Sequence, residues 1–172
     1  MPTSGSRLPR PRAGSDAPAP RLRLTVQRAV ATGGLPVRST LRRWLSRALA
    51  RDATVTVRFV GAAEGRRLNR EFRGKDYATN VLTFVYEGAP APAAARGPAP
   101  LNGDLALCVP VLLREARAAR KPLRAHCAHL VIHGALHLQG FDHESAKDAK
   151  VMEALETRLL AALGYGDPYA TN

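Results

Sequence analysis

The sequence predicts an α+β domain in which a small mixed sheet of four strands is packed with about five helices. Two kinds of apolar spacing lead to this prediction. Some short segments alternate apolar and polar residues as strands do, while longer segments repeat apolar residues with helical spacing. Because several helical segments follow one another near the end of the chain, we expect them to cover mainly one side of the sheet. The order of the strands stays open.

The first strand and helix are predicted from residues 22–26 and 39–49. Apolar and polar residues alternate over 22–26, and Ser39 is placed to cap a helix that carries Trp44 into the core. The opposite face of this helix is basic. Two interpretations of that face stay open, a solvated surface and a nucleic-acid contact. Its arginines are Arg38, Arg42, Arg43, Arg47 and Arg51.

A second strand and helix follow. Residues 53–60 alternate valine and phenylalanine with polar residues, which indicates a strand. Residues 64–73 have helical spacing, and we expect Leu68 and Phe72 to face inward.

The second half of the chain supplies two short strands and three helices. The strands are predicted at 81–85 and 105–109, separated by a surface loop of alanine, proline and glycine at 88–100. Proline in a first turn and helical spacing predict the helices. They span 110–120, 122–139 and 146–163.

Length and composition predict one domain, residues 21–172, preceded by a disordered basic tail at 1–20. The net charge of +12 favours a polyanionic partner, of which nucleic acid is the commonest. We find neither a membrane-spanning apolar segment nor a secretory signal, so we expect a cytoplasmic protein. Cys108 and Cys127 are expected to be buried thiols without a disulfide.

The most informative segment is 133–143, which contains three of the five histidines. His133 and His137 lie four residues apart, on one face of a helix. Gly140 suits the end of that helix, so the chain can return His143 to the same point. Three imidazoles around one centre are typical of a catalytic zinc with an open fourth position. We therefore expect one Zn²⁺ per chain, at the end of a central helix.

The same spacing occurs in a large class of zinc proteases, but those enzymes carry a glutamate general base directly after the first histidine. Here that position is Gly134, which offers no proton acceptor, so a protease is disfavoured. The general base stays open. Its candidates are Asp142, His129, Glu144 and Asp104. The alternative role of Asp142 is to orient a ligand histidine, and that of His129 is structural.

With these motifs in view, the chain resembles the YbeY family of metal-dependent endoribonucleases, the bacterial rRNA maturation factors. The resemblance rests on four stretches, which are the histidine segment, 68–84, 101–105 and 163–169. It implies that His133, His137 and His143 are zinc ligands and that Arg73 is an important basic residue. Ala78 replaces a usual proline of the family, and Phe141 replaces a common tyrosine.

The resemblance implies single-strand-specific, zinc-dependent cleavage of RNA. It places the activity in ribosomal RNA processing at the 3′ end of 16S rRNA and in ribosome quality control. The implied partners are ribosomal RNA and the small subunit, with ribosomal proteins or a GTPase as helpers. The oligomeric state stays open.

Several residues are chemically suited to this activity. His133 and His137 hold the catalytic metal, and the guanidinium of Arg73 suits the phosphate oxygens on which charge collects. Lys75 is a second substrate-binding candidate. Two roles of Asp76 stay open: to orient either basic side chain by pairing, or to serve only as a turn residue. Thr79 and Asn80 suit the lining of a groove or the capping of a turn.

Two rival functions remain. A zinc hydrolase of peptide or amide bonds needs a carboxylate at the open side of the metal. A non-catalytic ribosome-associated metalloprotein explains the basic charge and the zinc without any cleavage.

Overall fold

We describe the fold from a computed structural model, which describes residues 18–88 and 97–171. Most of the predicted basic tail and the centre of the predicted loop at 88–100 lie outside these residues. Within them the predicted fold class is confirmed. Four strands form a single mixed sheet, with five helices around it.

The sheet has the order β1-β2-β4-β3. β1 pairs with β2 and β2 with β4 in parallel, whereas β3 pairs with β4 antiparallel. The strands are β1 (Leu22–Arg28), β2 (Ala53–Val60), β3 (Val81–Tyr86) and β4 (Leu101–Cys108). β1 and β3 are therefore the two edge strands.

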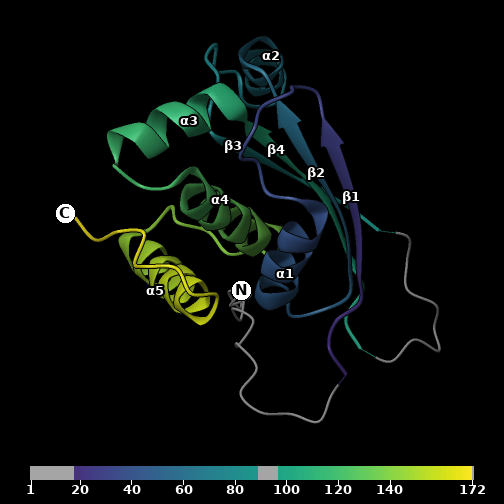
Figure 1. Cartoon of the computed structure of the whole chain (residues 1–172). Helices are drawn as coiled ribbons and strands as arrows, with labels where there is room; N and C mark the ends of the chain where they lie inside the picture. The colour runs from purple at the N-terminus through teal and green to yellow at the C-terminus, as the bar shows by residue number, and fades with distance from the viewer. Residues whose placement is uncertain (1–17, 89–96, 172) are drawn as a thin grey trace.

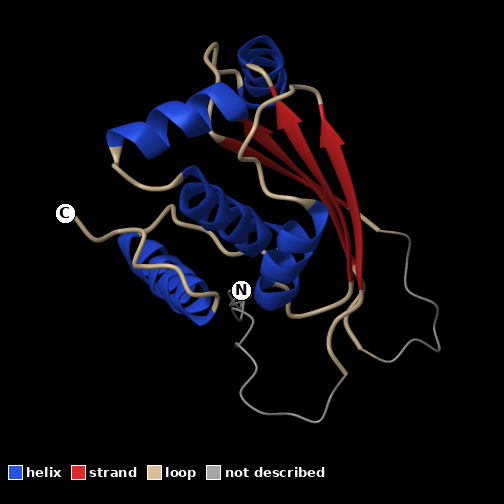
Figure 2. Ribbon diagram, viewed as in Figure 1, coloured by secondary structure: helices blue, strands red, loops and turns tan. Residues whose placement is uncertain are grey.

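Four of the five helices lie on one side of the sheet (Figures 1 and 2). α1 and α4 are nearest to the strands, and α3 and α5 contact α4. α2 lies at one end of the sheet and contacts β4 and α3. The helices are α1 (Arg38–Ala48), α2 (Ala62–Arg73), α3 (Val109–Ala118), α4 (Leu123–Leu138) and α5 (Ala146–Ala162). α4 is thus the central helix of the predicted arrangement. None of these described helices combines the length and apolarity needed to span a membrane.

The main core lies between the sheet and α1 and α4. Trp44 of α1, Phe59 of β2, Leu105 of β4 and Ile132 of α4 are all fully buried there. Burial of this apolar surface is the main force that holds the layers together. Cys108 and Cys127 are buried free thiols, as expected.

Glycines let α4 approach the sheet closely. A Cβ at Gly103 of β4 would come within 2.2 Å of Leu138 Cδ2 and 2.5 Å of the Phe84 carbonyl oxygen. At Gly134 of α4, a Cβ would come within 2.7 Å of Leu105 Cδ2. All three distances are far inside van der Waals contact, so α4 can lie this close to β3 and β4 only because glycine occupies both positions.

The structure corrects three details of the prediction. Ser39 does not cap α1, because the helix already begins at Arg38 and its N-cap is Val37, which makes no side-chain cap. β4 begins at Leu101 rather than at residue 105, because pairing with β2 and β3 extends it. Phe72 is 63% exposed instead of facing inward.

The exposure of Phe72 follows from the place of α2 at the end of the sheet. There the positions of α2 that become buried are Gly65 and Asn69. Leu68 is half-buried. Phe72 keeps an edge-to-face contact with the Phe84 ring, with 5.0 Å between the centroids.

Part of the basic face of α1 has a structural role. Arg38 and Arg42 donate hydrogen bonds of 2.7 and 2.8 Å to the carbonyl oxygens of Leu24 and Leu22. Those carbonyls belong to the edge strand β1, so the guanidiniums occupy acceptors that would otherwise be open to another strand. This explains two of the five arginines without nucleic acid.

Candidate metal centre and cleft

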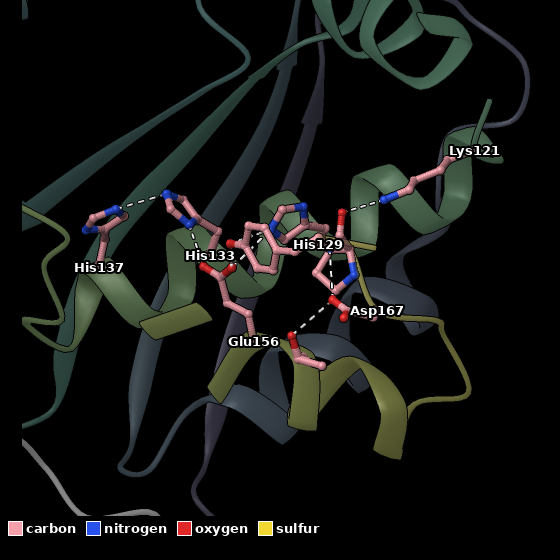
Figure 3. Close-up of polar contacts among 9 residues, drawn as sticks. Lys121, His129, His133, His137, Glu156 and Asp167 are labelled. Atoms are coloured by element: carbon pink, nitrogen blue, oxygen red, sulfur yellow. Dashed lines mark hydrogen bonds and ion pairs between the residues drawn. The ribbon is translucent and has the colours of Figure 1, made fainter. Parts of the chain in front are cut away.

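The two histidines on α4 meet as the spacing predicts. His133 and His137 lie one helical turn apart, and their Nε2 atoms are 3.0 Å from each other (Figure 3). Two ring nitrogens at this distance can bind one metal ion. The pair therefore offers two ligands on one side of α4.

The chain reversal after α4 brings the third histidine to the same point. Gly140 has φ +88° in the left-handed region, and the Phe141 amide donates to the Leu136 carbonyl at 3.1 Å. This is the helix ending that glycine favours. One ligand atom from each of His133, His137 and His143 then lies within 4.8 Å of the other two.

The rings of the two helical histidines are held from behind. His133 Nδ1 lies 2.5 Å from Glu156 Oε1, and His137 Nδ1 lies 2.9 Å from the Phe141 carbonyl oxygen. Both acceptors favour a proton on Nδ1, which leaves the lone pair on Nε2. This tautomer is the one a metal ion at the Nε2 side requires.

The electrostatics of His137 also suit a metal ligand. Burial, together with repulsion from His133 and His143, lowers its pKa to about 4. The imidazole of His137 is consequently neutral at pH 7. Because metal ions bind only the unprotonated ring, the donor set fits a zinc ion.

Glu156 of α5 is the principal residue that the sequence analysis missed. Its side chain is 0% exposed, and it is hydrogen-bonded by His133, His129 and Tyr169. Burial alone would raise its pKa, but these three hydrogen bonds outweigh burial and lower the pKa to about 2. A signal was present. Met152, Glu156 and Leu160 are four residues apart, so a carboxylate stands on the buried stripe of α5.

His129, His133 and Glu156 also place ligand-capable atoms within 4.8 Å of one another. In this group Glu156 Oε1 already lies 2.5 Å from His133 Nδ1, and Oε2 lies 3.0 Å from His129 Nε2. The group is therefore satisfied by its own hydrogen bonds, and Glu156 supports His133 from the side away from His137 (Figure 3).

A cleft of about 650 Å³ opens in front of the three histidines. Arg73, at the C-terminal end of α2, contributes to its lining and is exposed. Lys75 is not among the lining residues in the described part of the chain. The remaining wall comes from β3, the segment before it and the reversal after α4, through Thr79, Asn80, Val81, Thr83, Gly140, Phe141, Asp142 and Glu144.

The acidic candidates have different surroundings. Asp142 and Glu144 line the cleft, and Asp142 Oδ1 accepts from the His143 amide at 2.6 Å rather than from a histidine ring. Asp104 lies instead in a smaller hollow beside Phe72 and Phe84, where Tyr86 Oη donates to it at 2.8 Å.

Asp76 and Asn80 also have specific partners. Asp76 pairs with Arg66 at 2.7 Å and not with the expected Arg73 or Lys75. This bond to the Arg66 guanidinium lowers the pKa of Asp76. Asn80 lines the cleft, its Oδ1 accepts from the Val81 amide at 2.7 Å, and its Nδ2 donates to the Glu115 carboxylate.

A family model and two curated relatives match most of this chain. A family model described as endoribonuclease YbeY matches residues 35–164. The endoribonuclease YbeY of Aromatoleum aromaticum is 56% identical over 92% of this chain and 99% of its own length. That of Nitrosospira multiformis is 55% identical over 87% and 82%. A solution structure from Thermotoga maritima is 25% identical, covers 86% of this chain and 99% of its own, and has a TM-score of 0.46.

Proposed function

Because the chain belongs to the YbeY endoribonuclease family, we propose that it is a zinc-dependent endoribonuclease that cleaves single-stranded RNA. The observation that supports this most strongly is the cleft, which has three histidine ligand atoms within 4.8 Å of one another and Arg73 in the same lining. A metal and a guanidinium facing one cleft are suited to a phosphodiester.

We assign the metal ligands to His133, His137 and His143, with one zinc ion per chain. Imidazole nitrogens suit zinc, and three protein ligands leave a position for substrate or water. When bound, the ion supplies a positive charge that polarises a phosphodiester and acidifies water. Glu156 and the Phe141 carbonyl keep the rings turned toward that position.

Arg73 is assigned to the substrate phosphate. Its side chain is exposed at the cleft, so it is accessible to RNA, and its planar fork donates two hydrogen bonds to neighbouring phosphate oxygens. Lys75, two residues further on, would attract the RNA backbone as a point charge outside the cleft. We assign proton transfer to Asp142 or Glu144, whose carboxylates line the cleft.

The rival peptidase function meets a steric obstacle. The position at which zinc proteases carry their glutamate is Gly134, and it faces Leu105 of the sheet rather than the cleft. A base at that position is therefore excluded by packing as well as by sequence. Peptide hydrolysis would have to rely on Asp142 or Glu144.

Membership of the family supports a proposal for the cellular role. We propose that the RNA is ribosomal, that cleavage serves maturation of the 16S rRNA 3′ end and ribosome quality control, and that the protein works in the cytoplasm. Ribosomal proteins or a GTPase would then bring it to the small subunit. The net charge of +12 is consistent with this polyanionic partner.

The decisive experiment compares cleavage of defined single-stranded and duplex RNA by zinc-loaded wild type, His133→Ala and Arg73→Ala. Arg70→Ala is a matched control, because Arg70 is an exposed arginine of the same helix that approaches Asp76 at 3.9 Å and does not line the cleft. We expect wild type and Arg70→Ala to cut single-stranded RNA, while the other two lose at least 100-fold in rate.

Folding and zinc content are measured for each protein. Equal cleavage by all four would reveal a contaminating nuclease and refute the assignment. Intact RNA in the presence of folded, zinc-loaded wild type would favour the non-catalytic rival.

A further inference from the structure

The C-terminal segment after α5 returns to α4 and is tied down at several points. The Asp167 carboxylate accepts from the Tyr169 amide at 2.9 Å and from Thr157 Oγ1 at 3.4 Å. Lys121, which precedes α4, donates to the Pro168 carbonyl (Figure 3). These bonds hold the turn that presents the side chain of Tyr169 to α5.

The hydroxyl of Tyr169 then reaches the buried carboxylate behind the metal centre. Tyr169 Oη donates to Glu156 Oε2, and His129 Nε2 lies 3.0 Å from the same oxygen. The other oxygen, Glu156 Oε1, accepts from His133 Nδ1. The two oxygens of Glu156 thus have different partners. Oε2 binds Tyr169 of the C-terminal segment and His129, whereas Oε1 binds the proposed metal ligand His133.

This division matters because a carboxylate can rotate about its terminal bond. Loss of the Tyr169 hydrogen bond would leave Oε2 with His129 as its remaining partner. Because a buried carboxylate depends on its hydrogen bonds, this loss favours rotation or displacement of Glu156. Movement of Oε1 in turn frees the ring of His133. Burial, followed by the bond to Glu156, raises the pKa of Tyr169, so its hydroxyl stays protonated and can donate.

We propose that Tyr169 is a positioning residue of the metal centre, which holds Glu156 in the orientation that directs His133 Nε2 toward the metal. The inference rests on the proposed zinc site and deepens it. It gives a chemical role to the segment Asp167-Pro168-Tyr169. Tyr169 lies 31 positions after Leu138, the last residue of the helix that carries His133.

The test measures zinc affinity by competition with a chromophoric chelator, using the full chain. Tyr169→Phe removes only the hydroxyl. Tyr165→Phe is the matched control, because Tyr165 belongs to the same segment, yet its hydroxyl accepts from Arg124 at 3.3 Å and its ring packs against Trp44. Changes around metal-bound histidines typically cost about 10- to 100-fold in metal affinity. We expect about 10-fold for Tyr169→Phe, since His129 still donates to Glu156, and no change for Tyr165→Phe.

Two further measurements separate positioning from general loosening. The visible absorption spectrum of the cobalt(II)-loaded protein reports the geometry of the ligands, and it should change in Tyr169→Phe and Glu156→Gln but not in Tyr165→Phe. Asp167→Ala keeps the hydroxyl but removes the acceptor for the Tyr169 amide, so it should weaken zinc binding less than Tyr169→Phe.

Wild-type zinc affinity and an unchanged cobalt spectrum in folded Tyr169→Phe would overturn the inference. An equal loss of affinity in both tyrosine variants would overturn it too, because it would assign the effect to the segment as a whole. These readouts do not involve RNA. A wild-type protein that binds zinc but leaves RNA intact would therefore refute the proposed function alone.

Discussion

Replacing Gly134 with alanine adds one methyl group where α4 touches the sheet. The new Cβ would lie 2.7 Å from Leu105 Cδ2, 3.3 Å from Leu105 Cδ1 and 3.4 Å from Thr83 Oγ1. The first distance is roughly 0.8 Å shorter than a favourable carbon contact of about 3.5 Å. Since Leu105 is fully buried, it can move only by displacing other core side chains.

Two effects of opposite sign determine the change in stability. Alanine favours a helix over glycine by about 1 kcal/mol, whereas forcing an extra methyl group into a packed core costs about 1–3 kcal/mol. We therefore expect Gly134→Ala to lower the free energy of unfolding by about 1 kcal/mol. In a Leu105→Val background the δ methyls are absent, so the same change should raise the free energy of unfolding by up to about 1 kcal/mol.

The assay is urea unfolding of the four metal-free proteins of this double-mutant cycle, because removing the metal separates packing from zinc binding. The expected coupling between Gly134→Ala and Leu105→Val is about 1–3 kcal/mol. A coupling near zero would show that the glycine is not required for the approach of α4, and would refute the steric explanation for the missing glutamate.

Three more outcomes are expected. In the metal-free protein the pKa of His137 is lowered from 6.5 to about 4. As the pH falls, the unfolded chain therefore takes up a proton on this residue at a higher pH than the folded chain does. Urea unfolding at a series of pH values should therefore show stability falling between about pH 6.5 and 4, and a flat profile would contradict the assigned environment of His137. Removing zinc with a chelator should lower the melting temperature of the wild type, measured by circular dichroism, but not that of His137→Ala; equal responses would place the metal elsewhere. Asn69→Ala leaves the Tyr77 carbonyl without its 2.7 Å donor and should cost about 1–3 kcal/mol in chemical unfolding, whereas an unchanged midpoint would contradict a structural role for this buried amide.

The accuracy of the sequence predictions depended on how local each feature is. Helical spacing predicted α4 almost to the residue, because an apolar stripe and a preceding proline act within a few turns. The start of β4 was missed, because Leu101-Asn102-Gly103-Asp104 contains residues typical of turns. Pairing with two neighbouring strands and the space needed by Leu138 make that stretch a strand.

The same distinction applies to the site. His133 and His137 were found because a spacing of four residues implies one helical face, and His143 because Gly140 allows the chain to reverse. The pairing of Asp76 with Arg66, and the separation of Asp104 from the cleft, depend on which face of an element meets which neighbour. No spacing in the sequence encodes that relation.

By itself, the sequence determined the α+β class, the central helix and the three histidines that we propose as zinc ligands, since each follows from contacts within a short stretch of chain. Tertiary structure alone decided that Glu156 and Tyr169 stand behind His133 and that Gly134 faces the sheet. These relations join α4 to α5, to the C-terminal segment and to β4. They arise only when burial of apolar surface brings those distant segments together, which leaves a carboxylate in the interior that needs partners.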